Sequence, residues 1–395
     1  MMNRTALTLL TTVLLSGCNL PGTGGLFGNF DPVDEDFSRP RPLITAEGAL
    51  MEECKDTTPL LRQDEVFAHA LCLCGDMQEV GQGLVTRSSS TLLGSDPDRG
   101  HVGINGSIQV VGNFDVDGTL DVAHGLSGVG SVAIGGDLIT NGDVEVTGSW
   151  DVGRDVWVAG DLQGVGSISI GRDLYLTGDL NTVGSVDYKV GHLGFAYNGG
   201  PCGCGSSEII DVAGEVAAHQ SANDNAKIPS TTGNTELLLE NGEFYFEGPA
   251  QLVGSSSVVI RGRAKVFVQG DLEAVGTLNF LVEEGAELEL WVSGTVSTVG
   301  NLSFVTSSDE RPRAFKLFMG GVGSSLVNVG NALFTGSVYA PQVDIEYVGN
   351  LEVHGSLFAN NLSGTGNLTV TYDSDVVAPA ACHDEVKGIL QTGGN

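Results

Sequence analysis

Basic residues are scarce in this chain, and their scarcity excludes one large class of partners. Among 395 residues, Lys and Arg number 18 against 49 Asp and Glu, which gives a formal net charge of -31 at pH 7. Such a surface repels the phosphates of nucleic acids. We therefore expect no nucleic-acid partner.

Short catalytic motifs are also lacking. The chain contains no nucleophile elbow, no phosphate-binding loop and no His-Glu-x-x-His zinc motif. The histidines are scattered along it: His69, His101, His124, His192, His219, His354 and His383. We expect neither catalysis nor a cofactor. A polysaccharide lyase or glycosidase is the alternative, although so few basic residues make a lyase site hard to place.

Long apolar runs are lacking too, apart from one near the N-terminus. Arg4 precedes the apolar stretch Ala6–Leu15, which has the length of a signal peptide and is too short to span a bilayer. It leads into Leu15-Ser16-Gly17-Cys18, which resembles a bacterial lipobox. The resemblance implies cleavage before Cys18 and lipidation of that residue. Asn19, where retention at the inner membrane usually requires Asp, favours the outer membrane. An ordinary cleaved signal peptide is the alternative.

Glycine, in contrast, is abundant and periodic. Its residues recur every 18 positions at Gly112, Gly130, Gly148, Gly166 and Gly184. Each interval divides into sixes in which the third and fifth residues are usually apolar, as in the pairs Val132/Ile134, Val156/Val158 and Ile168/Ile170. Such alternation is typical of strands, and glycine permits sharp corners. Three short strands and three corners predict a triangular coil.

Stacked coils of this kind predict an all-β protein, a triangular β-solenoid or parallel β-helix. Parallel crossovers are nearly always right-handed, so we expect a right-handed solenoid. The alternative is the left-handed hexapeptide helix of acyltransferases, but Asp115 and Asp151 occupy positions where that pattern wants a small residue.

Changes of pattern divide the chain into segments. We expect a signal peptide (1–17), a lipidated tether (18–46), a small helical N-terminal cap (47–100) and a regular solenoid of 18-residue coils (101–190). An insertion (191–243) carries a helix near Ser206 to Gln220 with Ser206 or Ser207 as N-cap. A second solenoid with longer coils (244–373) and a tail or C-terminal cap (374–395) follow.

Two rows of aspartates are the weak candidates for a calcium site. Their spacing of 18 stacks Asp137, Asp155 and Asp173 at one corner, and Asp143, Asp161 and Asp179 at another. Stacked carboxylates repel one another unless a cation bridges them. Aspartate after a corner glycine can also accept hydrogen bonds from the backbone amides of its own turn, and we favour this structural role.

One side of the regular coils has an apolar and aromatic outer row, formed by Ile139, Trp157 and Tyr175. An open row of this kind is a possible platform for carbohydrate or a protein partner. We expect instead that the inserted helix covers it, through Ile209, Val212 or Val216.

Seven cysteines minus Cys18 leave an even number, which in an exported chain predicts disulfides. The candidates are Cys54, Cys72, Cys74, Cys202, Cys204 and Cys382, and we expect all of them outside the regular coils. Their pairing is not derivable from the sequence. Zinc held by four of the thiolates with His69 or His383 is the alternative.

Several segments resemble known families. Gly136-Asp137-Leu138, Gly160-Asp161-Leu162 and Gly178-Asp179-Leu180 look like the repeats of bactofilins, which form polymers of triangular β-helices. The segments 70–76 (ALCLCGD), 202–226 and Gly336–Pro341 (GSVYAP) together resemble an uncharacterised family of myxobacterial-type outer-membrane lipoproteins. The last of these segments is similar to a C-terminal domain also found in PilX-type pilus-associated proteins. This family lends no catalytic residue.

These observations predict a lipid-anchored β-solenoid on the outer membrane with a structural or adhesive role. We expect its partners to be the membrane, through the lipid, and envelope proteins or polysaccharide. A polysaccharide-active enzyme and a calcium-dependent carbohydrate-binding module are the alternative functions.

Overall fold

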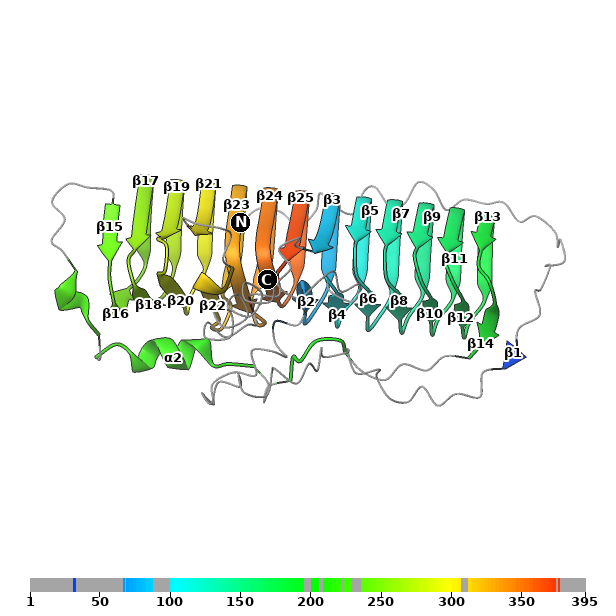
Figure 1. Cartoon of the computed structure of the whole chain (residues 1–395), viewed down its shortest axis with the longest axis horizontal. Coiled ribbons are helices and arrows are strands. Elements are labelled where there is room, and N and C mark those ends of the chain that lie inside the picture. Colours follow the sequence, from blue (N-terminus) through cyan, green and yellow to red (C-terminus); the bar gives the residue numbers. More distant parts are fainter. Residues whose placement is uncertain are drawn as a thin grey trace, which may run out of the picture.

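The computed structural model describes residues 31–32, 67, 69–87, 100–194, 200–205, 209–221, 223–228, 236–306, 312–373 and 376. They form a mostly β structure, a parallel β-solenoid of about 12 turns with one short helix (Figure 1). This confirms the predicted β-solenoid; its right-handed sense stays a prediction. Signal peptide, lipidation site Cys18, Cys54, Cys382 and His383 lie outside the described residues.

The N-terminal block, residues 71–193, is a stack of coils that each contain one short and one long strand. The short strands are β2 (Leu71–Leu73), β4 (Val102–Ile104), β6 (Leu120–Val122), β8 (Leu138–Thr140), β10 (Val156–Val158), β12 (Leu174–Leu176) and β14 (Gly191–Leu193). The long strands are β3 (Met77–Arg87), β5 (Ile108–Val116), β7 (Leu126–Ile134), β9 (Val144–Val152), β11 (Leu162–Ile170) and β13 (Leu180–Asp187). A two-residue strand, β1 (Asp31–Pro32), pairs with β14.

The predicted phase of the regular coils is confirmed. Val132, Ile134, Val156, Val158, Ile168 and Ile170 are all buried in the interior. Asp137 and Asp155, the residues whose burial would contradict that phase, are only partly buried.

The coil has fewer separate strands than predicted. Two of its three sides merge into one nine-residue strand, as in β9, which bends at Gly148. Gly148 has φ of +130°, and a Cβ there would lie 2.0 Å from the carbonyl oxygen of Gly130. Only glycine fits at this corner, so the chain turns without breaking the hydrogen bonds between coils.

The C-terminal block, residues 236–372, continues the same stacking with longer coils. Its strands are β15 (Glu236–Leu239), β16 (Gly242–Glu247), β17 (Ala250–Ile260), β18 (Arg263–Gln269), β19 (Leu272–Val282), β20 (Glu287–Val292), β21 (Val296–Thr306), β22 (Phe315–Met319), β23 (Ser325–Ala340), β24 (Asp344–Ala359) and β25 (Leu362–Tyr372). Two 3-10 turns lie at Asn225–Lys227 and Pro312–Ala314. The coils therefore resume at Glu236, earlier than the predicted position near Phe244.

The two blocks join at the middle of the solenoid, in an order that the chain sequence does not suggest. The N-terminal block runs outward from the middle to β14, and the chain then returns along the solenoid and starts the C-terminal block at the opposite end (Figure 1). The last long strand, β25, pairs in parallel with β3, and β24 pairs with β2. We call the β25–β3 contact the seam.

The seam corrects the predicted N-terminal cap. Residues 71–73 and 77–87 are strands in the middle of the solenoid, so the predicted helical cap over 47–100 is wrong for these residues. The C-terminal strand β25 lies between β24 and β3, and the tail or cap predicted for residues 374–395 lies outside the described residues apart from Val376. Leu71, one of the apolar residues attributed to helical spacing, belongs instead to β2, which pairs with β24 on one side and β4 on the other.

The inserted helix is shorter than predicted. Helix α2 spans Val212–Ala218, and Asp211, rather than Ser206 or Ser207, caps it by accepting a hydrogen bond from the Gly214 amide. No helix among the described residues is long and apolar enough to cross a membrane.

Candidate interaction surface

The short strands, and the C-terminal ends of β23 and β24, place one outward position per turn in a continuous row along one face of the solenoid. We call it the covered row, because the returning segment, described at residues 200–205, 209–221 and 223–228, lies over part of it. In spatial order it contains Tyr245, Phe267, Trp291, Phe318, Tyr339, Phe358, Cys72, Gly103, Asp121, Ile139, Trp157, Tyr175 and His192. The predicted apolar row is thus one part of a longer, largely aromatic one.

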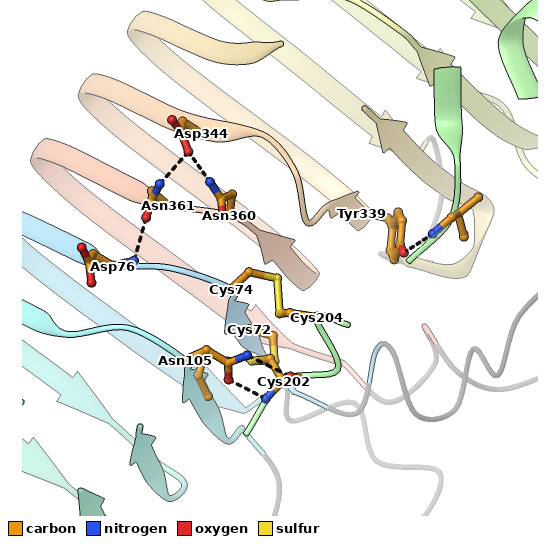
Figure 2. Close-up of a disulfide and its surroundings, with 12 residues drawn as sticks. Cys72, Cys74, Asp76, Asn105, Cys202, Cys204, Tyr339, Asp344, Asn360 and Asn361 are labelled. Carbon is orange, nitrogen blue, oxygen red and sulfur yellow. Dashed lines mark hydrogen bonds between the residues drawn. A yellow bond between two sulfur atoms is a disulfide. The ribbon is translucent and has the colours of Figure 1, made fainter. Parts of the chain in front are cut away.

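Two disulfides hold the returning segment against this face close to the seam. They join Cys72 to Cys202 and Cys74 to Cys204, each across 130 residues of sequence (Figure 2). The two Cys-x-Cys pairs therefore lie side by side in matching register. The four described cysteines lie outside the regular coils of residues 101–190, as predicted, although Cys72 belongs to a strand of the solenoid, β2.

Asn105 orients the bridge from the adjacent coil. Its Nδ2 donates to the Cys202 carbonyl at 2.9 Å, and its Oδ1 accepts from the Cys202 amide at 3.0 Å (Figure 2). Gly103 makes room for the segment, since a Cβ there would lie 3.0 Å from both the Cys202 sulfur and Pro201. The cysteines could be identified from the sequence, but Asn105 and Gly103 could not, because their partners are about 100 residues away.

Helix α2 covers the row on the C-terminal block rather than at Trp157 and Tyr175. Val212 and Val216 are buried, and α2 packs on β18 and β20. The Ile210 amide donates to the Tyr339 hydroxyl at 2.9 Å, and the His219 ring stacks on Phe267 at 3.8 Å. The predicted position of the helix is therefore wrong. The chain has to return to the far end of the solenoid to begin the C-terminal block, and this takes the helix beyond the N-terminal coils.

Trp157 and Tyr175 do not form the open platform considered from the sequence. Their rings stack with centroids 3.5 Å apart, and Tyr175 stacks in turn on His192 at 4.4 Å. Trp157 is only 8% exposed and Tyr175 is half-buried. Because the ring faces are stacked on one another and on His192, little aromatic surface is left for a sugar to stack on.

The two aspartate rows bind backbone amides of neighbouring coils. Asp137 Oδ1 accepts from the Asp155 amide at 2.9 Å, and Asp155 Oδ1 accepts from the Asp173 amide at 3.0 Å. The second row, Asp143, Asp161 and Asp179, repeats this contact at 2.8 Å. The amide bound is that of the next coil, not of the residue's own turn as predicted. Each such bond links two coils.

Two side chains of other coils lie beside the first row. Arg172 lies 3.9 Å from Asp155, and His192 lies 3.4 Å from Asp173. Among the described residues, no three His, Cys, Asp or Glu side chains gather where they could hold a metal ion. The four described cysteines are oxidised, so they are not thiolate ligands for the alternative zinc site. Burial, together with nearby His101, lowers the pKa of His69 to about 4.

A second row, on the corner next to each glycine, is exposed. We call it the valine edge: Val253, Val275, Val299, Val329, Val348, Thr365, Val80, Val111, Val129, Thr147, Val165 and Val183. Its valines are between 45% and 82% exposed. It runs the whole length of both blocks and crosses the seam without a gap. Its Val-Gly pairs were visible in the sequence, but their union into one edge depends on the seam.

The comparisons with known proteins concern the C-terminal block. Residues 206–377 match the family model of a domain of unknown function, DUF7305. This match includes α2 and every strand of the C-terminal block. Searches of curated proteins and of solved structures found no match. The chain thus contains a DUF7305 domain within a β-solenoid fold.

Proposed function

We propose that this protein is a structural or adhesive component of the cell envelope, lipid-anchored at the outer membrane through Cys18, and not an enzyme. The observation that carries the proposal is the valine edge, in which nearly every turn exposes an apolar side chain in a single line. Contiguous exposed apolar surface typically marks a site of interaction. Successive residues of the valine edge are about 4.8 Å apart, the spacing of neighbouring strands. An edge of this length and regularity suits an extended envelope protein or polysaccharide.

The disulfides support an extracytoplasmic location. Both bridges close long loops, and disulfides of this kind persist in oxidising compartments. The lipobox-like segment before Cys18 supports anchoring by more than one acyl chain, which membrane attachment needs to be stable.

Metabolic labelling with a radioactive fatty acid tests the anchor. We expect the full-length chain to take up label and to fractionate with outer membranes, and the Cys18→Ser variant to do neither. An unlabelled native chain recovered in the soluble periplasmic fraction would contradict the anchor without bearing on the valine edge.

Binding assays on a soluble form beginning at Asn19 test the role. The form is screened on a glycan array and against envelope fractions, and incubated with polysaccharides, each with and without calcium. We expect binding without depolymerisation and without calcium dependence. Release of reducing or unsaturated ends would favour an enzyme. Binding that disappears with a chelator would favour the calcium-dependent module.

Substitutions on the edge identify the surface responsible. Val129→Lys combined with Val165→Lys places two charges on the valine edge, and we expect binding to fall at least tenfold. Val322→Lys is the matched control, because Val322 is fully exposed but lies away from the edge. Equal binding by both variants would remove the valine edge from the proposal.

A further inference from the structure

The seam joins strands from the two ends of the described chain, so it is an interface between two blocks rather than a step between consecutive coils. Residues 362–372 of β25 pair with residues 77–87 of β3 in unbroken register, with Gly366 opposite Gly81. A line of hydrogen bonds at one corner of the coils also crosses the seam. Asn361 Oδ1 accepts from the Asp76 amide at 2.7 Å, and Asp344 Oδ1 accepts from Asn361 Nδ2 at 2.7 Å (Figure 2).

A buried polar pair inside the solenoid also links the blocks. The Tyr347 hydroxyl of β24 donates to Glu79 Oε2 of β3, although β25 lies between these two strands. The contact is possible because β25 has Gly364 at this point. A Cβ on Gly364 would lie 2.2 Å from the Tyr347 ring. Glu79 is only 1% exposed, and among the described residues its Oε1 has no hydrogen-bond partner.

This pair gives the seam a specificity that apolar packing alone lacks, as does the buried Thr298–Asn328 pair on the same row within the C-terminal block. Coils of a solenoid resemble one another, so an apolar interior alone would accept a slipped or substituted neighbour. Tyr347 meets Glu79 only when one coil, with glycine at the matching position, separates them. Buried polar contacts of this type select one register at a cost in stability.

We infer that the seam is a separable docking interface, keyed by Glu79 and Tyr347, at which the C-terminal block of one chain can accept β3 of a second copy in place of its own. The contact is heterologous, since the edge of β25 meets the different edge of β3. Exchange between copies would therefore link chains head to tail. This inference is independent of the proposed envelope function.

The groups that face Glu79 determine how docking responds to pH. Tyr347 faces it from β24, whereas β25 presents Gly364 and β5 presents Val110. The nearby acidic residues Glu346 and Asp76 are exposed on the outer surface of the solenoid and do not face Glu79. Burial raises the pKa of Glu79 to about 7, against a smaller lowering by the Tyr347 hydroxyl. Docking is therefore strongest when Glu79 is protonated and weakens as pH rises through about 7.

A cross-link placed at the seam tests the inference in the whole soluble chain. Thr86 and Thr371 face one another across it, with their hydroxyl oxygens 3.4 Å apart. Both are replaced by cysteine in a chain that begins at Asn19 and carries Cys54→Ser and Cys382→Ser. Heavy-isotope and natural-isotope preparations are mixed and incubated at mildly acidic or mildly alkaline pH. Both samples are then brought to neutral pH, cross-linked briefly with a short bis-maleimide and analysed by mass spectrometry.

We expect cross-links within single chains after acidic incubation. After alkaline incubation we expect heavy-to-light cross-links between chains, at least five times more abundant and increasing with protein concentration. Glu79→Gln, which cannot ionise, should keep cross-links within chains under both conditions. A chain without the two new cysteines is the control for unspecific links.

Two results would overturn the inference. Cross-links confined to single chains after alkaline incubation at high concentration would mean that the blocks do not separate. Equal exchange by the native and Glu79→Gln chains would mean that Glu79 does not key the seam.

Discussion

The two blocks have the same corner and the same stacking but different coil lengths, and the difference decides what fills their interiors. In the regular coils of the N-terminal block, from β4 to β13, equivalent residues are 18 apart and the interior consists largely of Val, Ile and Leu. In the C-terminal block, equivalent residues are 17 to 30 apart. Its interior contains a stack of rings in which Phe304 lies 4.5 Å from Phe280 and 5.2 Å from Phe334. Longer coils thus accommodate aromatic side chains.

The outer faces differ in the same way. Large aromatic residues dominate the covered row on the C-terminal block, where α2 packs over Phe267 and Trp291. Close to the seam the covered row has two small residues, Cys72 and Gly103. The returning segment is bound covalently there, through Cys72. Small residues of the row thus lie where the extended segment is attached.

The largest effect should come from a charge inside the narrow N-terminal block. Val158 is fully buried, so Val158→Asp places an unpaired carboxylate among apolar side chains. We expect a loss of about 4 kcal/mol or more in the free energy of unfolding. Guanidinium denaturation followed by tryptophan fluorescence measures it. The control Ala133→Asp, at an outward position, should change stability by less than about 0.5 kcal/mol; equal losses would contradict the assigned phase.

Removing an aromatic ring from the C-terminal block should destabilise the protein more than removing methyl groups from the N-terminal block. Phe304 is buried and stacks on Phe280, Phe315 and Phe334, so Phe304→Ala should cost about 4 kcal/mol. Val132→Ala in the N-terminal block removes less volume and should cost about 2 kcal/mol. The same denaturation measurement compares them. Similar losses would show that the wider interior is packed loosely around its aromatic stack.

Removal of one disulfide tests the attachment of the returning segment. Cys72→Ser combined with Cys202→Ser opens a loop of 130 residues and should lower stability by about 3 kcal/mol. The pair Cys74→Ser and Cys204→Ser should behave alike. We expect the remaining bridge to limit the loss, so that all four substitutions together cost more than either pair. An unchanged melting temperature for both pairs would show that the bridges do not stabilise the fold.

The contribution of the seam to the free energy of unfolding should depend on pH, unlike that of the apolar interiors of the two blocks. Because the pKa of Glu79 is about 7 in the folded chain against an ordinary value of 4.5, its contribution to stability is full below pH 4.5 and is lost as pH rises to about 7. The corresponding change is about 3 kcal/mol. The difference in unfolding free energy between the native chain and Glu79→Gln, measured from acidic to alkaline pH, should follow this course. Tyr347→Phe should extend the loss to higher pH, since its hydroxyl lowers the pKa.

The regular coils could be predicted residue by residue, because an 18-residue period leaves one phase that buries Val132, Ile134 and their equivalents. The corner glycines and aspartates were predictable for the same reason. In the C-terminal block the spacing varies, so the sequence indicated coils and Val-Gly landmarks but not which residues pair.

The seam could not be predicted from local patterns. Leu71 and Cys72 have the alternation of a short strand and also match helical spacing, and what decides between them is β24 and β25, nearly 300 residues away. The pairing of the cysteines and the position of α2 both depend on the path by which the chain returns. Glu79 likewise looks like an ordinary surface residue until the register brings Tyr347 over Gly364.

The position of the seam also sets the order in which the solenoid can be completed. During synthesis β3 is among the first strands to be made and β25 is the last described one. The β3 edge of the N-terminal block therefore stays unpaired until nearly the whole chain has been made. Vectorial folding from the N-terminus therefore cannot finish by adding coils to a growing end. A truncated product would leave two open edges at mid-length, which makes the closing contact a physical check that synthesis has reached β25.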